Sequence, residues 1–308
     1  MDVQKLHPEL RKAYSRMPAV PVHIPAVRHV FTLLMKLMPS RIKPVAGVSI
    51  EDRSVGQCTV RIFRPEGKTS GAGLMWIHGG GYIMGNIGMN DRECAALAKE
   101  LQLVVVFVDY RLAPRHPFPA ALDDCFEAWK FMQASAAELG LDRERIAVLG
   151  QSAGGGLAAG LVQRLADTGG VQPAIQVLMY PMIDDRTAAN QELDQARHFF
   201  WNNRNNRGAW DWYLGKPPGL GDMPAYSVPA RREDLSGLPP SWMCVGEVDL
   251  FYQEDCAYAE RLRAAGVPCE LHIAPQTPHA YDFIAPDSSV TKATMQDCYR
   301  FIRTQLHL

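Results

Sequence analysis

The sequence has almost no net charge and contains no long apolar run. It carries 32 Lys and Arg against 33 Asp and Glu, so its formal charge is −1 at pH 7. Such a balance gives no reason to expect a nucleic acid or an anionic membrane surface as a partner. No window reaches the ~18 uninterrupted apolar residues of a membrane-spanning helix, and the residues after Met1 lead into no apolar core of a signal peptide. We therefore expect a cytoplasmic protein without stable membrane insertion.

The sequence also lacks the cysteine spacing of a disulfide framework or a zinc site. Its seven cysteines are odd in number, lie scattered between Cys58 and Cys298, and never form C-x-x-C. Several occur in apolar stretches, such as Cys244 within W-M-C-V. This pattern is typical of small buried hydrophobic residues in a reducing compartment.

Internal repeats and low-complexity tracts are absent as well, and the composition is that of a globular protein. Apolar residues make up 47% and charged residues 21%, which are ordinary values for a soluble chain. At ~100–200 residues per domain the length would allow two small domains, but large α/β folds commonly exceed that size. We expect one large α/β domain with an added cap.

Predicted strands and helices alternate from about residue 72 to the end of the sequence. Short apolar runs predict strands at residues 74–77, 103–108, 146–149, 175–180, 242–245 and 270–274. Helical periodicity predicts helices at residues 90–100, 120–132 and 251–265 and close to the end of the chain. A further strand, residues 59–64, alternates in polarity and stops at Pro65, which predicts a position at or near a sheet edge. The alternation favours a mostly parallel, doubly wound sheet flanked by helices.

Two segments outside this alternation predict a helical lid. Residues 1–45 carry an apolar stripe of helical period at residues 27–38, which suits a mobile flap and a helix docked on the core equally well. Residues 184–228 lack strand character, and their Trp and Tyr side chains more often form the core of a cap than line a substrate pocket. The predicted division is an N-terminal cap segment (1–45), a cap insertion (184–228) and a catalytic domain (46–183 and 229–308).

The strongest chemical signal lies between residues 146 and 156. An apolar run predicts a buried strand there, and G-x-S-x-G follows it with Ser152 at its centre. Glycines beside Ser152 allow the tight strand-to-helix turn that exposes a serine hydroxyl, and the following helix leaves its first N–H groups unpaired. Leucines every fourth residue, at positions 157, 161 and 165, indicate that this helix packs on a sheet. Because this context is present, we interpret Ser152 as a nucleophile and not as a chance match.

A serine hydroxyl becomes a good nucleophile only when a base takes its proton and a carboxylate orients that base. His279 is the only one of the nine histidines that lies in a loop after a predicted strand downstream of Ser152. Asp249 directly follows the predicted strand 242–245. The order Ser, acid, His along the chain favours Asp249 as the acid and His279 as the base. We expect the neighbouring acids to face solvent or to cap the next helix: Glu247, Glu254 and Asp255.

A glycine run predicts the groups that would stabilise an oxyanion. The sequence W-I-H-G-G-G, which contains His78, Gly80 and Gly81, ends a predicted strand. Three consecutive glycines leave backbone N–H groups accessible in the loop where an oxyanion hole is expected. We predict that the N–H groups of Gly80, Gly81 and Ala153 converge on the substrate's carbonyl oxygen. His78 would orient the loop.

Several motifs together indicate a family. They are W-I-H-G-G-G-Y (76–82), V-D-Y-R-L-A-P-R-H-P-F-P-A-A-L-D-D-C (108–125), G-Q-S-A-G-G (150–155), Y-P-M-I-D (180–184) and G-E-V-D-L (246–250). With these motifs the chain resembles the bacterial hormone-sensitive-lipase-like family (family IV) of α/β-hydrolase esterases over about residues 50–308. The resemblance implies an α/β-hydrolase fold, a two-part helical cap and hydrolysis of carboxylic esters with short or medium acyl chains. It also implies the site residues: a triad of Ser152, Asp249 and His279, and an oxyanion hole at Gly80, Gly81 and Ala153.

Three positions depart from the family pattern. Gln151 precedes the nucleophile where Asp or Thr is usual, the histidine motif reads P-H-A-Y-D-F where H-G-F is common, and Leu250 stands where a Pro usually follows the acid. We expect Gln151 to alter the hydrogen bonding behind the nucleophile. Because no catalytic group is removed, substrate preference should change more than activity. Asp109 and Arg111 of V-D-Y-R are expected to form a structural ion pair and not to act in catalysis.

We therefore predict a serine carboxylesterase that cleaves short- to medium-chain acyl esters through an acyl-enzyme intermediate. No metal and no organic cofactor is implied, and the expected partner is a small-molecule ester and not a nucleic acid. A homodimer is a common outcome for such folds. Two alternatives share the fold: an amidase or arylformamidase-like hydrolase, and a small-ligand receptor that has lost catalysis. The presence of all three triad residues argues against the receptor.

Overall fold

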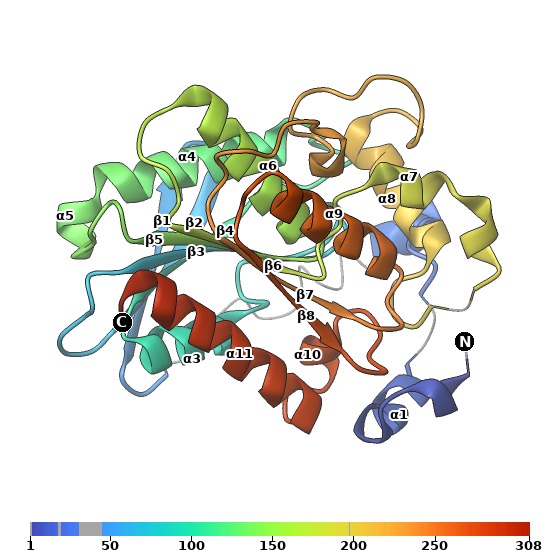
Figure 1. Cartoon of the computed structure of the whole chain (residues 1–308), viewed down its shortest axis with the longest axis horizontal. Helices are drawn as coiled ribbons and strands as arrows, with labels where there is room; N and C mark the ends of the chain where they lie inside the picture. The colour runs from blue at the N-terminus through green and yellow to red at the C-terminus, as the bar shows by residue number, and fades with distance from the viewer. Residues whose placement is uncertain (1, 18–19, 31–44, 197) are drawn as a thin grey trace.

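An eight-stranded sheet runs through the molecule (Figure 1). The computed structural model describes residues 2–17, 20–30, 45–196 and 198–308. The strand order is β1-β2-β4-β3-β5-β6-β7-β8. The strands are β1 Val48–Val55, β2 Cys58–Pro65, β3 Gly73–Ile77, β4 Val104–Asp109, β5 Ile146–Gln151, β6 Ile175–Met179, β7 Ser241–Gly246 and β8 Cys269–Ala274. Strands β3 to β8 run parallel to one another, and the antiparallel hairpin of β1 and β2 joins them where β2 pairs with β4.

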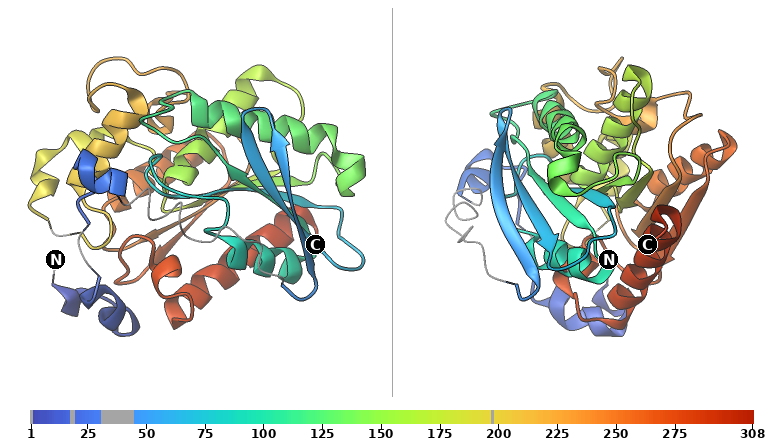
Figure 2. Two further views of the ribbon diagram at one scale, coloured as in Figure 1. Left: turned by 180° about the vertical axis from the view of Figure 1, so that it is seen from behind. Right: turned by 90° about the vertical axis from the view of Figure 1, so that its left-hand side faces the viewer.

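Helices cover both faces of the sheet (Figures 1 and 2). Helices α4, α6 and α9 lie on one face, and α3 and α11 lie on the other. The α-helices are α1 Pro8–Ser15, α3 Asp91–Leu101, α4 Ala120–Ala134, α5 Ala136–Leu139, α6 Ala153–Thr168, α7 Asp185–Ala189, α8 Asn203–Leu214, α9 Tyr252–Ala264, α10 Tyr281–Ile284 and α11 Ser289–Leu306. Short 3₁₀ helices are η1 Val3–Lys5, η2 Gln191–Asp194 and η3 Pro229–Arg231.

The two faces of β4 belong to two different hydrophobic cores. Val104, Val106 and Val108 pack in the core under α4, α6 and α9. Val105 and Phe107 pack in the core under α3 and α11. A strand covered on both faces must be apolar throughout, which is why the sequence shows a continuous apolar run here. The predicted mostly parallel α/β sheet flanked by helices is confirmed.

The antiparallel hairpin shows why the sheet edge has a weaker sequence signal. β2 is second from the edge, as its alternating sequence and Pro65 predicted. β1 is the edge strand itself, and its middle residues are exposed or half-buried while Val48 and Val55 at its two ends are buried. An edge strand needs few apolar residues because one of its sides has no neighbouring strand.

Helix α8 in residues 184–228 contacts the N-terminal part of the chain. The backbone N–H of His23 donates to Asn205 Oδ1 at 3.2 Å, and Asn205 Nδ2 donates to the carbonyl oxygen of Val20 at 3.0 Å. The Arg28 guanidinium lies 4.3 Å from the ring centre of Trp212. Two segments far apart in the sequence are therefore joined by hydrogen bonds and a cation–π contact.

The aromatic residues of α8 mostly form a core, as predicted. Trp210 and Tyr213 are buried and pack against Tyr82 of the glycine loop that follows β3. The apolar stripe predicted at residues 27–38 falls largely outside the described residues. Its described part, residues 27–30, lies in a helix that begins at residue 25.

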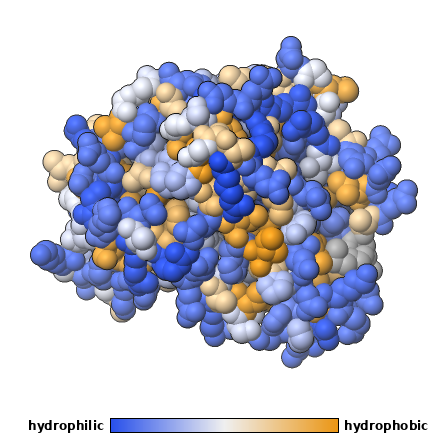
Figure 3. Space-filling view, in the orientation of Figure 1, coloured by the Kyte–Doolittle hydropathy of each residue, from blue (hydrophilic) through white to orange (hydrophobic). Residues whose placement is uncertain are grey.

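The face of the molecule in Figure 3 is largely hydrophilic, with apolar side chains gathered in small patches between polar ones. In the described ranges, no helix combines the length and the apolar content that crossing a bilayer requires. All seven cysteines are free thiols, and five of them are buried, which matches their expected role as small core residues.

Candidate active site

Ser152 lies at the turn between β5 and α6. β5 ends at Gln151 and α6 begins at Ala153, so the chain reverses direction at a single residue. The φ of 53° and ψ of −120° at Ser152 fall in a region that residues with a side chain rarely adopt. The turn also packs closely at Gly154, where a Cβ would lie 2.2 Å from the carbonyl oxygen of Ile77. Because Gly154 has no side chain, the turn that carries Ser152 can pack against the end of β3.

The three side chains predicted as a triad form one hydrogen-bonded row. Ser152 Oγ is 2.8 Å from His279 Nε2, and His279 Nδ1 is 2.8 Å from Asp249 Oδ2. All three residues are more than nine-tenths buried. Beside a carboxylate, Nδ1 carries the proton and donates it, which leaves Nε2 free to accept from the serine hydroxyl. The arrangement can move a proton from Ser152 onto His279.

Loops after the last two strands hold the acid and the histidine. Asp249 Oδ1 accepts from the backbone N–H of Phe251 at 3.0 Å, so both carboxylate oxygens have partners. The Tyr14 hydroxyl donates to the carbonyl oxygen of His279 at 2.9 Å, which joins the histidine loop to α1. The rings of Tyr180 and Phe251 lie edge-on to the imidazole at 4.9 and 5.0 Å. These contacts restrict the imidazole to the orientation that faces Ser152.

His78 holds the glycine loop after β3. Its Nδ1 lies 2.6 Å from the carbonyl oxygen of Gly79, and its ring stacks on Tyr110 at 4.2 Å. Burial lowers the pKa of His78 to about 4, so a neutral ring donates from Nδ1 at physiological pH. The Tyr110 hydroxyl in turn donates to the carbonyl oxygen of His78 at 3.0 Å. These contacts orient the loop, as predicted for His78.

The three predicted oxyanion donors are backbone N–H groups of the glycine loop and of the turn at Ser152. Ile83 and Met84 both donate to the carbonyl oxygen of Gly80, which folds the glycine loop into a turn. In the described part of the chain, the N–H groups of Gly80 and Gly81 have no backbone acceptor. Ala153 is the first residue of α6, where an N–H has no acceptor within the helix. Within the described residues, none of the three N–H groups is therefore used by a backbone hydrogen bond.

The indole ring of Trp201 lies directly on this glycine loop. A Cβ at Gly81 would be 2.4 Å from Cη2 of Trp201, so a side chain at Gly81 would displace the indole. Trp201 is buried, and its Nε1 is 3.4 Å from Asn206 Oδ1 of α8. Residues 184–228 thus reach the predicted oxyanion donors.

Comparison with known proteins decides the family. The sequence profile of the alpha/beta hydrolase fold family matches residues 74–283, which form most of the chain and include every predicted site residue. This chain belongs to the α/β-hydrolase family. Within it, the predicted membership of the hormone-sensitive-lipase-like esterases is confirmed by relatives that are named esterases.

Three of these relatives show how far the similarity extends. Esterase LipI of Mycobacterium tuberculosis is 36% identical over 208 residues, which cover 68% of this chain and 65%, just under two thirds, of LipI. Carboxylesterase NlhH of the same organism is 37% identical over 250 residues, or 75% of each chain. The solved structure of a bacterial heroin esterase superposes with a TM-score of 0.90 at 36% identity and covers 99% of both chains. The likeness to that structure therefore extends over nearly the whole chain.

A buried polar network lies behind Ser152 in this α/β-hydrolase. Gln151 Nε2 donates to Asp282 Oδ2 at 3.0 Å, and Gln151 Oε1 accepts from Asn90 Nδ2 at 3.2 Å. The Tyr180 hydroxyl donates to the other oxygen of Asp282 at 2.6 Å. Burial raises the pKa of Asp282. An amide at position 151 offers a donor and an acceptor at once, whereas an Asp there would bring a second carboxylate toward Asp282.

Altered hydrogen bonding at Gln151 was predicted, but its partner Asp282 was not. A signal lay close by, because the histidine motif departs from the family's H-G-F at Ala280 and Tyr281, directly before Asp282. The two departures are therefore linked in space: the unusual residue before the nucleophile binds the acidic residue that follows the unusual histidine motif.

The predicted ion pair between Asp109 and Arg111 is wrong. Arg111 pairs instead with Asp124 of α4, where Nε and Nη2 each lie 2.9 Å from a carboxylate oxygen. Asp124 also accepts from the backbone N–H of Arg111 at 2.8 Å. β4 ends at Asp109, and the chain beyond it turns toward α4, which separates the two side chains. Burial raises the pKa of the Asp109 carboxyl to about 6.

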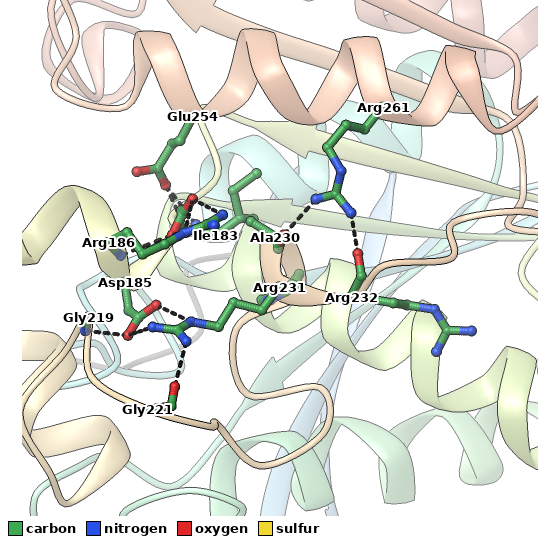
Figure 4. Close-up of polar contacts among 12 residues, drawn as sticks. Ile183, Asp185, Arg186, Gly219, Gly221, Ala230, Arg231, Arg232, Glu254 and Arg261 are labelled. Carbon is green, nitrogen blue, oxygen red and sulfur yellow. Dashed lines mark hydrogen bonds and ion pairs between the residues drawn. The ribbon is translucent and has the colours of Figure 1, made fainter.

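Two acids that were expected to face solvent or cap a helix are buried. Glu254 accepts through Oε1 from the backbone N–H groups of Ile183 and Asp184 at 2.9 and 3.1 Å (Figure 4). Asp255 is fully buried, and neither of its carboxylate oxygens has a hydrogen-bond partner among the described residues. The expectation failed because the segment after β6 covers the first turn of α9. Glu247 is exposed, as expected.

Arginine side chains connect the start of residues 184–228 and the segment just after them to neighbouring parts of the protein (Figure 4). Arg231 donates to the buried Asp185 from Nε at 2.7 Å and from Nη2 at 3.0 Å. Arg261 of α9 donates to the carbonyl oxygens of Ala230 and Arg232. A cavity of about 700 Å³ adjoins these arginines. The guanidinium groups of Arg231 and Arg261 already have protein acceptors.

Asp255→Asn is expected to raise the free energy of unfolding by about 1–3 kcal/mol near pH 8. Burial, together with the charges of Glu254 and Asp249, raises the pKa of Asp255 well above its ordinary value. The native state therefore keeps a proton that the unfolded state releases above about pH 4, so stability falls as the pH rises. Denaturant unfolding at about pH 4.5 and pH 8 would measure this loss, which should be smaller in the variant than in the wild type.

Asp287→Asn is a matched control. Asp287 is exposed and lies 3.6 Å from an equally exposed Arg92, so its removal should leave the pH dependence unchanged. Equal losses of stability in the wild type and in Asp255→Asn would show that Asp255 does not cause the pH dependence.

Proposed function

We propose that this α/β-hydrolase is a carboxylesterase that cleaves short- to medium-chain acyl esters with Ser152, His279 and Asp249 as its triad. The observation that carries the proposal is their hydrogen-bonded row after β5, β8 and β7. The names of its relatives, a carboxylesterase and a heroin esterase, support ester hydrolysis. No step of this chemistry requires a metal or an organic cofactor.

Acylation would come first. Ser152 Oγ attacks the ester carbonyl carbon while its proton moves to His279 Nε2. The oxyanion that forms accepts hydrogen bonds from the N–H groups of Gly80, Gly81 and Ala153. The bond between the carbonyl carbon and the alcohol oxygen then breaks, and His279 gives its proton to that oxygen. The products are the free alcohol and an acyl ester on Ser152.

Deacylation would repeat these steps with water. His279 Nε2 takes a proton from water, the hydroxide oxygen bonds to the acyl carbon, and the oxyanion again lies against the three N–H groups. The bond to Ser152 Oγ breaks, Oγ recovers the proton from His279, and the carboxylic acid leaves. In both halves the carboxylate of Asp249 stabilises the imidazolium through Nδ1–H.

Residues 1–45 and 184–228 would act as a two-part cap over a catalytic domain formed by residues 46–183 and 229–308. The contacts of Asn205 with Val20 and His23 support the pairing of the two segments. The position of Trp201 against Gly81 supports a cap that borders the acyl site.

A fluorophosphonate probe is expected to label the protein once, on Ser152. The activated hydroxyl displaces the fluoride from phosphorus, and the product resembles the tetrahedral intermediate, so labelling requires the base His279 and the oxyanion donors. Mass spectrometry of the intact protein should show one added phosphonyl group, and peptide mapping should locate it at Ser152. Hydrolysis of p-nitrophenyl acetate should fall in proportion to labelling.

Other buried serines serve as internal controls. Ser241 and Ser288 are buried but have no imidazole partner among the described residues, so they should stay unlabelled. Labelling elsewhere, or full hydrolysis by the labelled protein, would contradict the proposed triad.

A further inference from the structure

Three consecutive aromatic residues each contact a different part of the proposed active site. Phe199 packs edge-on against Tyr14 with 6.0 Å between ring centres. Phe200 lies over the imidazole of His279, with 6.4 Å between ring centres and 24° between the ring planes. Trp201 lies on the glycine loop that carries the proposed oxyanion donors. The segment therefore extends from the base to the site of the substrate's carbonyl oxygen.

A strained turn presents Phe200. The N–H of Trp201 donates to the carbonyl oxygen of Phe199 at 2.8 Å, which closes a three-residue turn with Phe200 at its centre. The φ of Phe200 is 66°, in the left-handed region that phenylalanine rarely adopts. Three-residue turns with a positive central φ are rare and strained. Such strain persists only where surrounding contacts impose it, and it is concentrated at functional sites.

The burial of the three rings shows which of them is free to meet a substrate. Trp201 is 5% exposed and anchors one side of the turn, and Phe199 anchors the other side on α1. Phe200 between them is 44% exposed, although Trp210 and Tyr213 of α8 are buried. An exposed aromatic ring beside a catalytic base offers an apolar contact surface that the protein itself does not fill.

The direction of proton transfer decides which part of the ester lies at Phe200. In acylation His279 Nε2 must give its proton to the oxygen of the departing alcohol, so that oxygen lies within hydrogen-bonding reach of the imidazole. The carbonyl oxygen lies at the glycine loop instead. The group that extends beside the imidazole, where Phe200 stands, is therefore the alcohol and not the acyl chain.

We propose that Phe200 is a specificity-determining residue that binds the alcohol part of the ester and favours esters of aromatic alcohols. The proposal rests on the proposed ester hydrolysis and names its preferred substrate class. An aromatic alcohol can pack face-on or edge-on against the exposed ring of Phe200, whereas a puckered aliphatic ring of similar size cannot. Small alkyl alcohols would leave the ring uncovered.

The test compares benzyl acetate with cyclohexylmethyl acetate. The two leaving groups have similar size and basicity and differ mainly in ring flatness, so chemical reactivity contributes little to the comparison. The wild type should favour the benzyl ester by roughly 2- to 12-fold in kcat/KM, the range that an aromatic pair provides. Phe200→Leu keeps an apolar side chain but removes the aromatic face, so this ratio should fall to about one.

Two controls separate this role from a structural one. Phe126→Leu changes a phenylalanine on α4 whose ring contacts Arg164 and Lys130, so it should keep the wild-type ratio. The ratio of rates on p-nitrophenyl butyrate and acetate reports the acyl side and should stay unchanged in Phe200→Leu. A benzyl preference that survives Phe200→Leu, or a change in the acyl ratio alone, would overturn the proposal. Loss of all ester hydrolysis in the wild type would instead overturn the proposed function.

Discussion

Ser152→Ala should lower kcat for p-nitrophenyl acetate and butyrate by roughly 10⁶-fold, a loss typical of removing a triad serine. Without Oγ, the short contact to His279 Nε2 has no proton to transfer and no acyl-enzyme can form. His279→Ala should lose nearly as much, because Oγ and Nε2 act as one unit. The double variant should lose little more. Steady-state kinetics of the three variants would measure this non-additivity.

The backbone at Ser152 supplies a control for folding. Its φ of 53° and ψ of −120° suit glycine and strain alanine. Ser152→Gly and Ser152→Ala should both be inactive. The free energy of unfolding of the glycine variant should be higher than that of the alanine variant by about 1 kcal/mol. Residual hydrolysis at the wild-type rate in either folded variant would rule out Ser152 as the nucleophile.

Asp249→Asn should lower kcat by roughly 10⁴-fold while the overall fold is kept. Asp249 Oδ1 accepts from the backbone N–H of Phe251, so an asparagine must place its carbonyl oxygen there and its NH₂ group toward His279. The NH₂ group donates to Nδ1, which moves the imidazole proton to Nε2. A protonated Nε2 cannot accept from Ser152. Steady-state kinetics and thermal unfolding of Asp249→Asn would test this. A lower kcat with an unchanged unfolding temperature would indicate the wrong tautomer of His279.

Asp255→Asn is the matched control for that substitution. Asp255 is a second buried acid and lies in the first turn of α9. It makes no hydrogen bond to His279. Activity should therefore stay within a few-fold of the wild type. If both asparagine variants lost activity to the same extent, the loss would come from a general disturbance of the buried site and not from the tautomer of His279.

The apolar pattern and the order of motifs made most of the fold predictable. Strand β4 is covered on both faces, so a continuous run of valines identified it, whereas the polar edge strand β1 gave little signal. Parallel strands end at the same edge of a sheet. For that reason three residues that follow strands, Ser152, Asp249 and His279, could be placed together before any coordinates were known.

Contacts between distant elements could not be predicted in the same way. Arg111 finds Asp124 and Gln151 finds Asp282 because helices and loops with no shared motif pack together. The burial of Asp255 depends on the segment that covers α9. The aromatic residues 199–201 resemble the apolar core of a cap in the sequence. The structure shows instead that a strained backbone leaves the side chain of Phe200 exposed.

The docking of α1 has a consequence for how the enzyme is made. Glu9 accepts from the N–H and the hydroxyl of Ser289, and the Tyr14 hydroxyl donates to the carbonyl oxygen of His279, so α1 rests on residues that follow it by 265 to 280 positions. A growing chain leaves the ribosome N-terminus first and folds as its partners appear. Helix α1 must therefore wait, undocked, until those later residues have been synthesised. A chain that stopped before residue 279 would contain the G-x-S-x-G turn but lack the imidazole that faces Ser152.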